Sequence, residues 1–152
     1  MNADEAKATG MLFYCPPADL KPEMVDPLLW PAVQAINASG WVWTAESCQG
    51  HPDDEDGMPW AFNTSPFLRL VTREENVGRM LAALVRAAQI PDDPLSTHVL
   101  ELATHRIKDG WTSTNVYVRA HTVRERNRGC QAFERFGEIV RASDNSEPRQ
   151  SK

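Results

Sequence analysis

The stretch from Thr44 to His51 contains the side chains of this sequence that are best suited to chemistry. It reads Thr-Ala-Glu-Ser-Cys-Gln-Gly-His, so hydroxyls, a thiol and an imidazole lie close to one glycine. Gly50 permits a tight turn in which a ligand can approach backbone amides. Cys48 and His51 have the spacing of a Cys-x-x-His half-site for a metal, and also that of a thiolate–imidazolium pair. The stretch therefore predicts a binding or reaction site at the end of a strand.

Metal binding stays an alternative for this stretch, because the sequence shows only part of a metal site. Cys48 and His51 are accompanied by no second Cys-x-x-His pair and by no Cys-x-x-Cys pair. The four histidines, at positions 51, 98, 105 and 121, lack a recognisable metal spacing. Asp53 and Asp54 could add oxygen ligands. The sequence thus predicts no complete metal site, and a metal-assisted enzyme using Cys48 and His51 stays open.

A second group of polar side chains is predicted on one face of a β-hairpin. Its strands run over His98–Ile107 and Ser113–His121, around a turn whose Gly110 takes the left-handed conformation. A register that places Leu100 opposite Val118 gives one apolar face. The opposite face then carries Glu101, His105, Asn115, Tyr117 and Arg119. Acid, base and cation converge on that face, which makes His105 and Glu101 the candidate catalytic residues.

Helical and strand patterns alternate around these two groups. The expected elements are a helix from about Trp30 to Gly40, a strand over Trp41–Cys48, a loop over 49–65, a strand over Phe67–Val71, a helix that ends at Ile90, the hairpin, and a helix that reaches about Arg141. Two capping boxes, Thr72–Glu75 and Thr122–Glu125, predict the starts of the last two helices. The order α-β-β-α-β-β-α predicts an α+β fold, with helices packed on one face of a small, mostly antiparallel sheet.

The chain is expected to form one domain with short tails. It has 152 residues, of which 41% are hydrophobic and 24% charged, values typical of a globular protein. Residues 1–10 are predicted to be a flexible N-terminus, 11–141 a single α+β domain that begins with a strand over Met11–Cys15, and 142–152 a disordered tail. Asp26 followed by Pro27 resembles a helix entry, although Pro31 moves the start of regular helix to near Trp30.

The net charge of −5 and the lack of a long apolar run limit the partners of the protein. A negative chain is not suited to coating nucleic acid nonspecifically. No apolar run approaches the length of a membrane span, and the N-terminus lacks a secretory pattern, so a cytoplasmic protein without membrane contact is expected. The charge is uneven, however, because Glu46–Asp56 is acidic and Arg119–Arg141 is basic. These two regions could orient the domain toward a polyanion.

Several stretches resemble the wybutosine-synthesis methyltransferases, which act on the tricyclic base precursor of phenylalanine tRNA. Ile36–Asn37 followed by Trp43–Gly50 is similar to that family's Ile-Asn helix end and to its strand ending in Thr-x-Ser-Ser-Cys-Ser-Gly-Arg. Ser65–Val71 is similar to the family's Pro-Phe strand. The final helix, with Asn127 and Phe133–Phe136, is similar to its Asn-rich, Arg-Phe helix. The similarity spans about residues 26–141.

The resemblance implies an α+β domain that binds S-adenosylmethionine and is unlike the Rossmann methyltransferases. It implies that the cofactor site is lined by Thr44, Ser47, Cys48 and Gly50, and His51 is added as a candidate because it ends the same loop. A nucleoside or RNA substrate would contact Trp60, Tyr117, Arg119, Arg124 and Arg128, because aromatic rings stack on bases and arginines contact phosphate. Two departures concern the substrate: the family's arginine after the glycine is His51 here, and the acidic stretch Asp53–Asp56 would repel tRNA.

Three classes of function follow from these observations. The first is a methyltransferase-like protein that uses S-adenosylmethionine and acts on or binds a nucleoside or RNA-type ligand. The second is a non-catalytic nucleotide-binding or protein-interaction protein, an accessory protein or inhibitor, whose Asp53–Asp56 loop contacts a basic protein partner. The third is the metal-assisted enzyme that uses Cys48 and His51. The first is the leading prediction, because its residues can be named.

Overall fold

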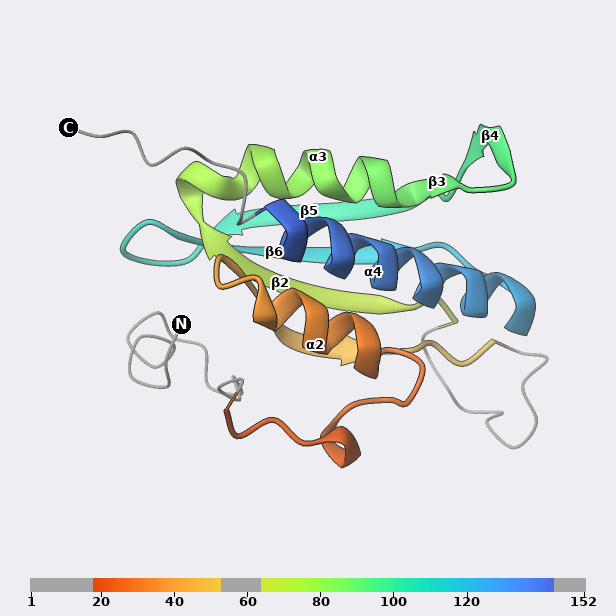
Figure 1. The fold of residues 1–152 in the computed structure, drawn as a ribbon, viewed down its shortest axis with the longest axis horizontal. Coiled ribbons are helices and arrows are strands. Elements are labelled where there is room, and N and C mark those ends of the chain that lie inside the picture. The colour runs from red at the N-terminus through yellow and green to blue at the C-terminus, as the bar shows by residue number, and fades with distance from the viewer. Residues whose placement is uncertain (1–17, 53–63, 144–152) are drawn as a thin grey trace.

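The computed structural model describes residues 18–52 and 64–143 (Figure 1). The predicted strand over Met11–Cys15, the flexible N-terminus, Trp60 and the acidic stretch Asp53–Asp56 lie outside the described residues. The elements in chain order are η1 (Pro22–Met24), α2 (Trp30–Ala38), β1 (Val42–Cys48), β2 (Phe67–Arg73), η2 (Glu74–Asn76), α3 (Val77–Ala88), β3 (Gln89–Ile90), β4 (Asp93–Thr97), β5 (Leu100–Arg106), β6 (Trp111–Val118) and α4 (Val123–Ser143).

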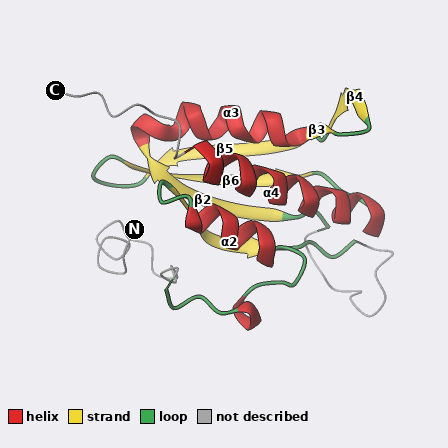
Figure 2. Cartoon of the chain, in the orientation of Figure 1, coloured by secondary structure: helices red, strands yellow, loops and turns green. Residues whose placement is uncertain are grey.

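The molecule is an α+β fold in which α2, α3 and α4 cover one face of an antiparallel sheet (Figures 1 and 2). The strand order is β1-β2-β6-β5, so β1 and β5 are the two edges. The predicted fold class is confirmed. One element was not predicted: the segment after α3 forms the small antiparallel hairpin of β3 and β4. Among the described helices, none combines the length and the apolar character that crossing a membrane requires.

The core lies between the helices and the inner two strands. Leu68 and Leu70 on β2 and Val116 on β6 are fully buried. They pack in one cluster with Phe133 and Phe136 of α4, which carries the apolar stripe expected of a helix on a sheet. Because side chains alternate along a strand, the residues between these core positions point to the opposite face of the sheet. That face carries the row Cys48, Phe67, Tyr117 and Glu101, one residue from each strand.

The β5–β6 hairpin has the register that the sequence predicts. Leu100 lies opposite Val118, and Glu101 lies opposite Tyr117. Gly110 in the turn has a φ of 78° and so takes the left-handed conformation, as expected, and the preceding Asp109 shares it with a φ of 54°. The turn chemistry and the apolar pattern therefore determine this hairpin.

One capping box is confirmed and the other is wrong. At the start of α4, the Glu125 amide donates to Thr122 Oγ1, and the Glu125 carboxylate accepts from the Thr122 amide. Thr72 is instead a buried residue of β2, and its hydroxyl donates to the Trp41 carbonyl at 2.6 Å. The helix after β2 begins with η2, whose N-cap, Arg73, makes no side-chain capping bond. The same four-residue pattern thus has two outcomes, because burial holds Thr72 in the sheet.

β1 carries an irregularity just before its end. Thr44 pairs with Leu70, and Glu46 pairs with Arg69, so the register shifts by one residue between Thr44 and Glu46. Such a bulge reverses the alternation of side chains that follow it. Ser47 consequently shares a sheet face with the core residue Leu68, and the next residue along β1 moves to the other face.

Candidate metal centre

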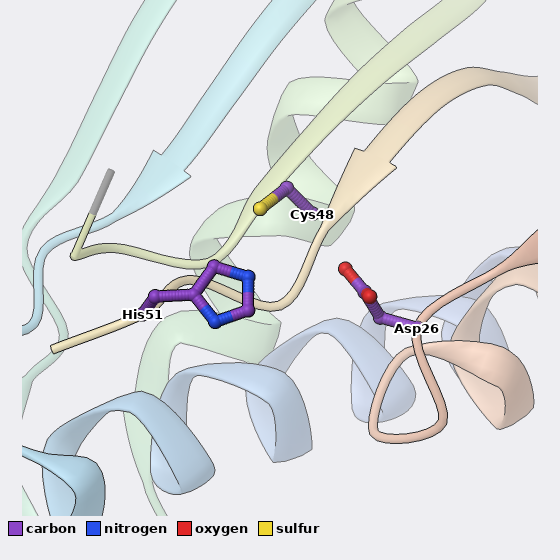
Figure 3. Close-up of side chains that lie close together, drawn as sticks. All are labelled: Asp26, Cys48 and His51. Carbon is purple, nitrogen blue, oxygen red and sulfur yellow. The ribbon is translucent and has the colours of Figure 1, made fainter. Parts of the chain in front are cut away.

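Asp26, Cys48 and His51 converge at the end of β1 (Figure 3). One carboxylate oxygen, the thiol sulfur and one ring nitrogen all lie within 4.8 Å of one another. Cys48 is the last residue of β1, His51 lies on the loop that follows, and Asp26 lies in the segment between η1 and α2. All three are partly buried. The cluster therefore brings three different donor types to one place that solvent and a ligand can reach.

Asp26 reaches the centre because it is not the cap of a helix. Regular helix begins only at Trp30, with Leu29 as its N-cap, which agrees with the effect predicted for Pro31. The Asp26 carboxylate instead accepts a hydrogen bond from the Gln49 amide at 2.8 Å. This bond fixes the carboxylate beside the Cys48–His51 turn. Sequence analysis considered Asp26 only as a helix entry and missed this role.

The turn from Cys48 to His51 rests on α4. Arg126, which is only 5% exposed, donates from Nη1 to the Gly50 carbonyl at 2.9 Å. The Cys130 thiol donates to the Gln49 carbonyl at 3.7 Å. The Gly50 amide donates to Cys48 Sγ at 3.4 Å. Helix α4 thus holds the backbone of the turn.

Gly50 occupies a place that no other residue fits. Its φ of 82° lies in the left-handed region. A Cβ on Gly50 would lie 2.6 Å from the Thr64 carbonyl oxygen and 2.9 Å from the Pro66 nitrogen, both backbone atoms. The segment from Thr64 to Pro66, which precedes β2, therefore packs directly against the turn. The sequence predicted that a ligand approaches the backbone amides at Gly50, and this stays a prediction; the group that lies against Gly50 in the structure is this chain's own backbone.

The two described cysteines have different chemical environments. Cys130 is buried, and this burial raises the pKa of its thiol to about 12. It therefore keeps its proton at neutral pH and acts as a hydrogen-bond donor to the turn. Cys48 is partly exposed and lies beside His51 and Asp26. Cys48 is consequently the cysteine that is accessible to a metal.

A cavity of about 260 Å³ lies beside the centre. It is lined by Thr44 and Ser47 of β1 and by Val25, which directly precedes Asp26. Asn37 at the end of α2 fixes this wall of the cavity, since it donates to Thr44 Oγ1 at 2.9 Å and accepts from the Thr44 amide at 3.0 Å. The cavity is small and partly polar, and it borders the sequence neighbours of Asp26 and Cys48 while none of the three clustered side chains lines it.

The donor set fits a transition metal of the zinc type. In a tetrahedral zinc site with bonds of 2.0–2.3 Å, ligand atoms lie about 3.3–3.8 Å apart, so the cluster needs to contract by only about 1 Å. Thiolate, imidazole and carboxylate together suit zinc better than magnesium or calcium, which prefer oxygen ligands alone. Gln49 supplies a further polar atom at this turn: its Oε1 is buried without a hydrogen-bond partner among the described residues.

The second predicted group lies elsewhere in the molecule. Glu101 is on β5, at the opposite end of the row that begins with Cys48 on β1. Three strand spacings of about 4.8 Å separate their backbones by roughly 14 Å. His105 lies four residues along β5 from Glu101, again about 13 Å away, so the two candidate catalytic side chains do not form a pair. Glu101 instead forms an ion pair with Arg119, and both side chains are exposed.

The predicted substrate-binding residues are spread over this second region. The Tyr117 ring packs on the Phe67 ring, with centroids 4.6 Å apart, on the sheet face opposite the helices. Arg124 and Arg128 are exposed on α4. Of the predicted residues, the structure therefore brings together Thr44, Ser47, Cys48, Gly50 and His51, and it leaves Tyr117, Arg119, Arg124 and Arg128 apart from them.

Three residues of the centre were missed by sequence analysis. One signal in the sequence concerned Asp26: it lies four residues before the start of regular helix at Trp30. Its carboxylate is therefore not needed as a helix cap and can bind another group. Asn37 was noted only as part of a family pattern. Arg126 carried no signal, because a buried arginine on a basic helix cannot be told from its exposed neighbours by type alone.

Comparison with protein-family models, with curated proteins and with solved structures finds no match to this chain, so the resemblance to the wybutosine-synthesis methyltransferases stays a prediction.

Proposed function

We propose that Asp26, Cys48 and His51 bind a zinc-type divalent metal, and that the protein is a metal-assisted enzyme for a small polar substrate. The observation that carries this proposal is the convergence of three donor atoms within 4.8 Å from segments on both sides of α2 and β1. Catalytic zinc sites commonly have three protein ligands and one open position, whereas structural sites have four protein ligands. A cluster of three protein donors matches the catalytic pattern.

The surrounding residues support chemistry at such a metal. A metal of this type polarises a bound carbonyl or phosphoryl group and lowers the pKa of a bound water. The Gln49 amide orients the Asp26 carboxylate, in the way that outer hydrogen bonds orient metal ligands. Thr44 and Ser47 line the adjoining cavity, where their hydroxyls can bind polar groups of a substrate. The favoured reaction class is therefore hydrolysis or a related addition to a polar double bond.

Metal titration of the purified protein tests the proposal. We expect the chelator-treated protein to bind one Zn²⁺ per chain in isothermal titration calorimetry. His51→Gln should weaken this binding by about 100-fold or more, since even outer residues of zinc sites contribute 10–100-fold. His105→Gln is the matched control: it removes an imidazole from the opposite edge of the sheet and should leave the affinity unchanged.

Cobalt substitution tests the ligand set and the open position. Co²⁺ should give a thiolate charge-transfer band that disappears in Cys48→Ser and persists in Cys130→Ser, because Cys130 is buried and protonated. A small anion such as thiocyanate should then change the visible spectrum of the Co²⁺ protein by occupying the open position. Equal Zn²⁺ affinity in His51→Gln and His105→Gln would contradict metal binding. A spectrum that is insensitive to added anions would contradict the catalytic role.

A second candidate function is binding of S-adenosylmethionine or a nucleoside, as the family resemblance implies. The observation that favours it is that Thr44 and Ser47, two of the residues expected to line that site, both line the cavity. Calorimetry with S-adenosylmethionine, in the absence of metal, should then show binding that Ser47→Phe abolishes by filling the cavity. If the ligand gives neither heat nor a thermal shift at millimolar concentration, this candidate is wrong and the metal proposal is unaffected.

A further inference from the structure

Strand β5 forms an edge of the sheet that is regular and exposed. No strand borders its outer side within residues 18–52 and 64–143. Six of its seven side chains are exposed, and the pairing with β6 runs from Leu100 to Arg106 without a bulge. The strand also has no proline. Natural edge strands normally have a bulge, a proline or a cover that prevents pairing with another chain. β5 lacks a bulge and a proline.

The hydrogen bonds of the hairpin show which backbone groups of β5 are free to pair. The Arg119 amide donates to the Val99 carbonyl, and the Ile107 amide donates to the Trp111 carbonyl. In an antiparallel ladder, every second residue bonds to the same neighbour. The odd-numbered residues of this strand therefore bond to β6. The amides and carbonyls of Leu100, Leu102, Thr104 and Arg106 point to the outer side.

Exposed apolar side chains accompany this edge. Leu102, on the face of β5 that the helices share, is 43% exposed. Val99, directly before β5, is 56% exposed, and Val85 on α3 is 61% exposed. Helix α3 lies over the β5 side of the sheet (Figure 1). A partner that adds a strand to β5 would cover Leu102 and Val99.

We propose that β5 pairs with β5 of a second copy of this chain, antiparallel and centred on Ala103. This register places Leu102 opposite Thr104 of the partner subunit and Leu100 opposite Arg106 of the partner subunit. These residues are the ones whose backbone groups point outward, so every free group in the strand finds a partner. The two-fold symmetry makes each pair occur twice, as a self-complementary interface requires. The two four-stranded sheets would join into one continuous sheet.

Charge complementarity favours a second copy over an unrelated strand. In the register centred on Ala103, Glu101 faces His105 of the partner subunit. The pair falls at a non-hydrogen-bonded position, where opposing side chains are closest. The symmetry gives this contact between acid and imidazole twice. A register centred on Leu102 would place Glu101 against Ala103 of the partner subunit and lose both contacts.

Sedimentation of the full chain tests this proposal separately from the metal centre, because the centre lies at β1, the opposite edge. We expect the wild type to sediment as a reversible dimer. Thr104→Pro removes an outward amide and no backbone bond to β6, and it should weaken the dimer by at least about 10-fold, since edge prolines block added strands. It also removes the hydroxyl bond between Thr104 and Thr114 at 2.9 Å, so Thr104→Val, which loses that bond alone, is the matched control and should still dimerise. Zn²⁺ affinity should not change in Thr104→Pro, and its circular dichroism should confirm that the fold is retained.

A charge exchange tests the register. His105→Glu alone places carboxylates opposite Glu101 and should weaken the dimer. The double variant His105→Glu with Glu101→Lys restores opposite charges at both contacts and should recover association to within a few-fold of the wild type. A wild type that stays monomeric up to the highest concentration it tolerates would overturn the proposal. A dimer that neither Thr104→Pro nor the charge exchange affects would overturn the β5 register equally.

Discussion

The two edges of the sheet differ in their regularity. β1 has a bulge between Thr44 and Glu46, and it adjoins a cavity walled by the segment around Val25. β5 pairs with β6 without any register shift and is exposed along its length. Both are seven-residue edge strands of one small sheet. The difference therefore lies in the backbone and side chains of each edge: β1 has an irregular backbone that ends in mixed donor side chains, and β5 has a regular, exposed backbone.

This contrast separates the two proposals in space: the proposed metal site lies at the β1 edge, and the proposed pairing with a second copy uses the β5 edge. The bulge in β1 changes which face Ser47 and Cys48 occupy, as bulges near functional sites often do. The segments around it supply Asp26 and the backing from Arg126. β5 needs none of this, since pairing with a second strand requires only a straight ladder. A change that distorts the backbone at β1 should consequently affect metal binding, and a comparable change at the β5 end should not.

The largest effect is expected for Gly50→Ala compared with Gly110→Ala. Both glycines have similar φ angles, 82° and 78°, so both variants lose about 1–2 kcal/mol to the left-handed conformation. Only at Gly50 does the added Cβ meet backbone atoms, at 2.6–2.9 Å; at Gly110 it meets open space. We therefore expect Gly50→Ala to lower the free energy of unfolding by about 3–5 kcal/mol in total.

Urea denaturation of the two variants measures this difference, and Zn²⁺ titration measures its functional part. Gly110→Ala should keep the metal affinity of the wild type, because its turn joins β5 and β6. If the two variants lose equal stability, the close approach of the turn to the segment before β2 is not a real constraint.

A smaller effect is expected from Arg126→Met, with Arg128→Met as its control. The two arginines lie two residues apart on α4, but Arg126 is buried and bonded to the Gly50 carbonyl, whereas Arg128 is exposed. Loss of the buried charge-assisted bond should cost about 2–4 kcal/mol. The exposed substitution should stay within about 0.5 kcal/mol. Thermal unfolding of both variants checks this, and equal melting temperatures would show that Arg126 does not support the turn.

Sequence reasoning predicted the elements better than the site, for physical reasons that particular residues show. The β5–β6 register followed from the apolar pattern and from Gly110, both of which are local properties. The candidate metal centre depends on the contact between Asp26 and a turn more than twenty residues away. It also depends on a one-residue bulge that no pattern in β1 indicates. Contacts between distant segments are set by packing, which the sequence alone does not display.

A smaller effect is expected when the threonines of the two capping-box sequences, Thr122 and Thr72, are substituted and compared. Thr122→Ala removes a true cap of α4 and should cost about 1 kcal/mol. Thr72→Val keeps the shape of a buried side chain but leaves the Trp41 carbonyl without its hydroxyl donor, and should cost about 1–2 kcal/mol. Helix content, measured by circular dichroism at the onset of unfolding, separates the two: fraying of a helix end should appear in Thr122→Ala alone. Fraying in Thr72→Val would mean that Thr72 caps α3 after all.

The smallest effect concerns acid stability near the β5 edge. His98 lies just before β5, and partial burial, followed by the nearby charges of Arg135 and Arg128, lowers its pKa below the usual 6.5. The folded protein therefore keeps His98 neutral at pH values where the unfolded chain already binds a proton. The stability that the neutral His98 side chain contributes is complete above about pH 7, and it is lost as the pH falls through 6.5 toward the lower folded pKa.

His98→Gln removes this loss, so its urea midpoint should fall less than that of the wild type between about pH 7 and pH 5. His121→Gln, at an exposed position beside α4, should keep the acid sensitivity of the wild type. An unchanged acid sensitivity in His98→Gln would show that burial and the two arginines do not lower the pKa of His98 in the folded protein.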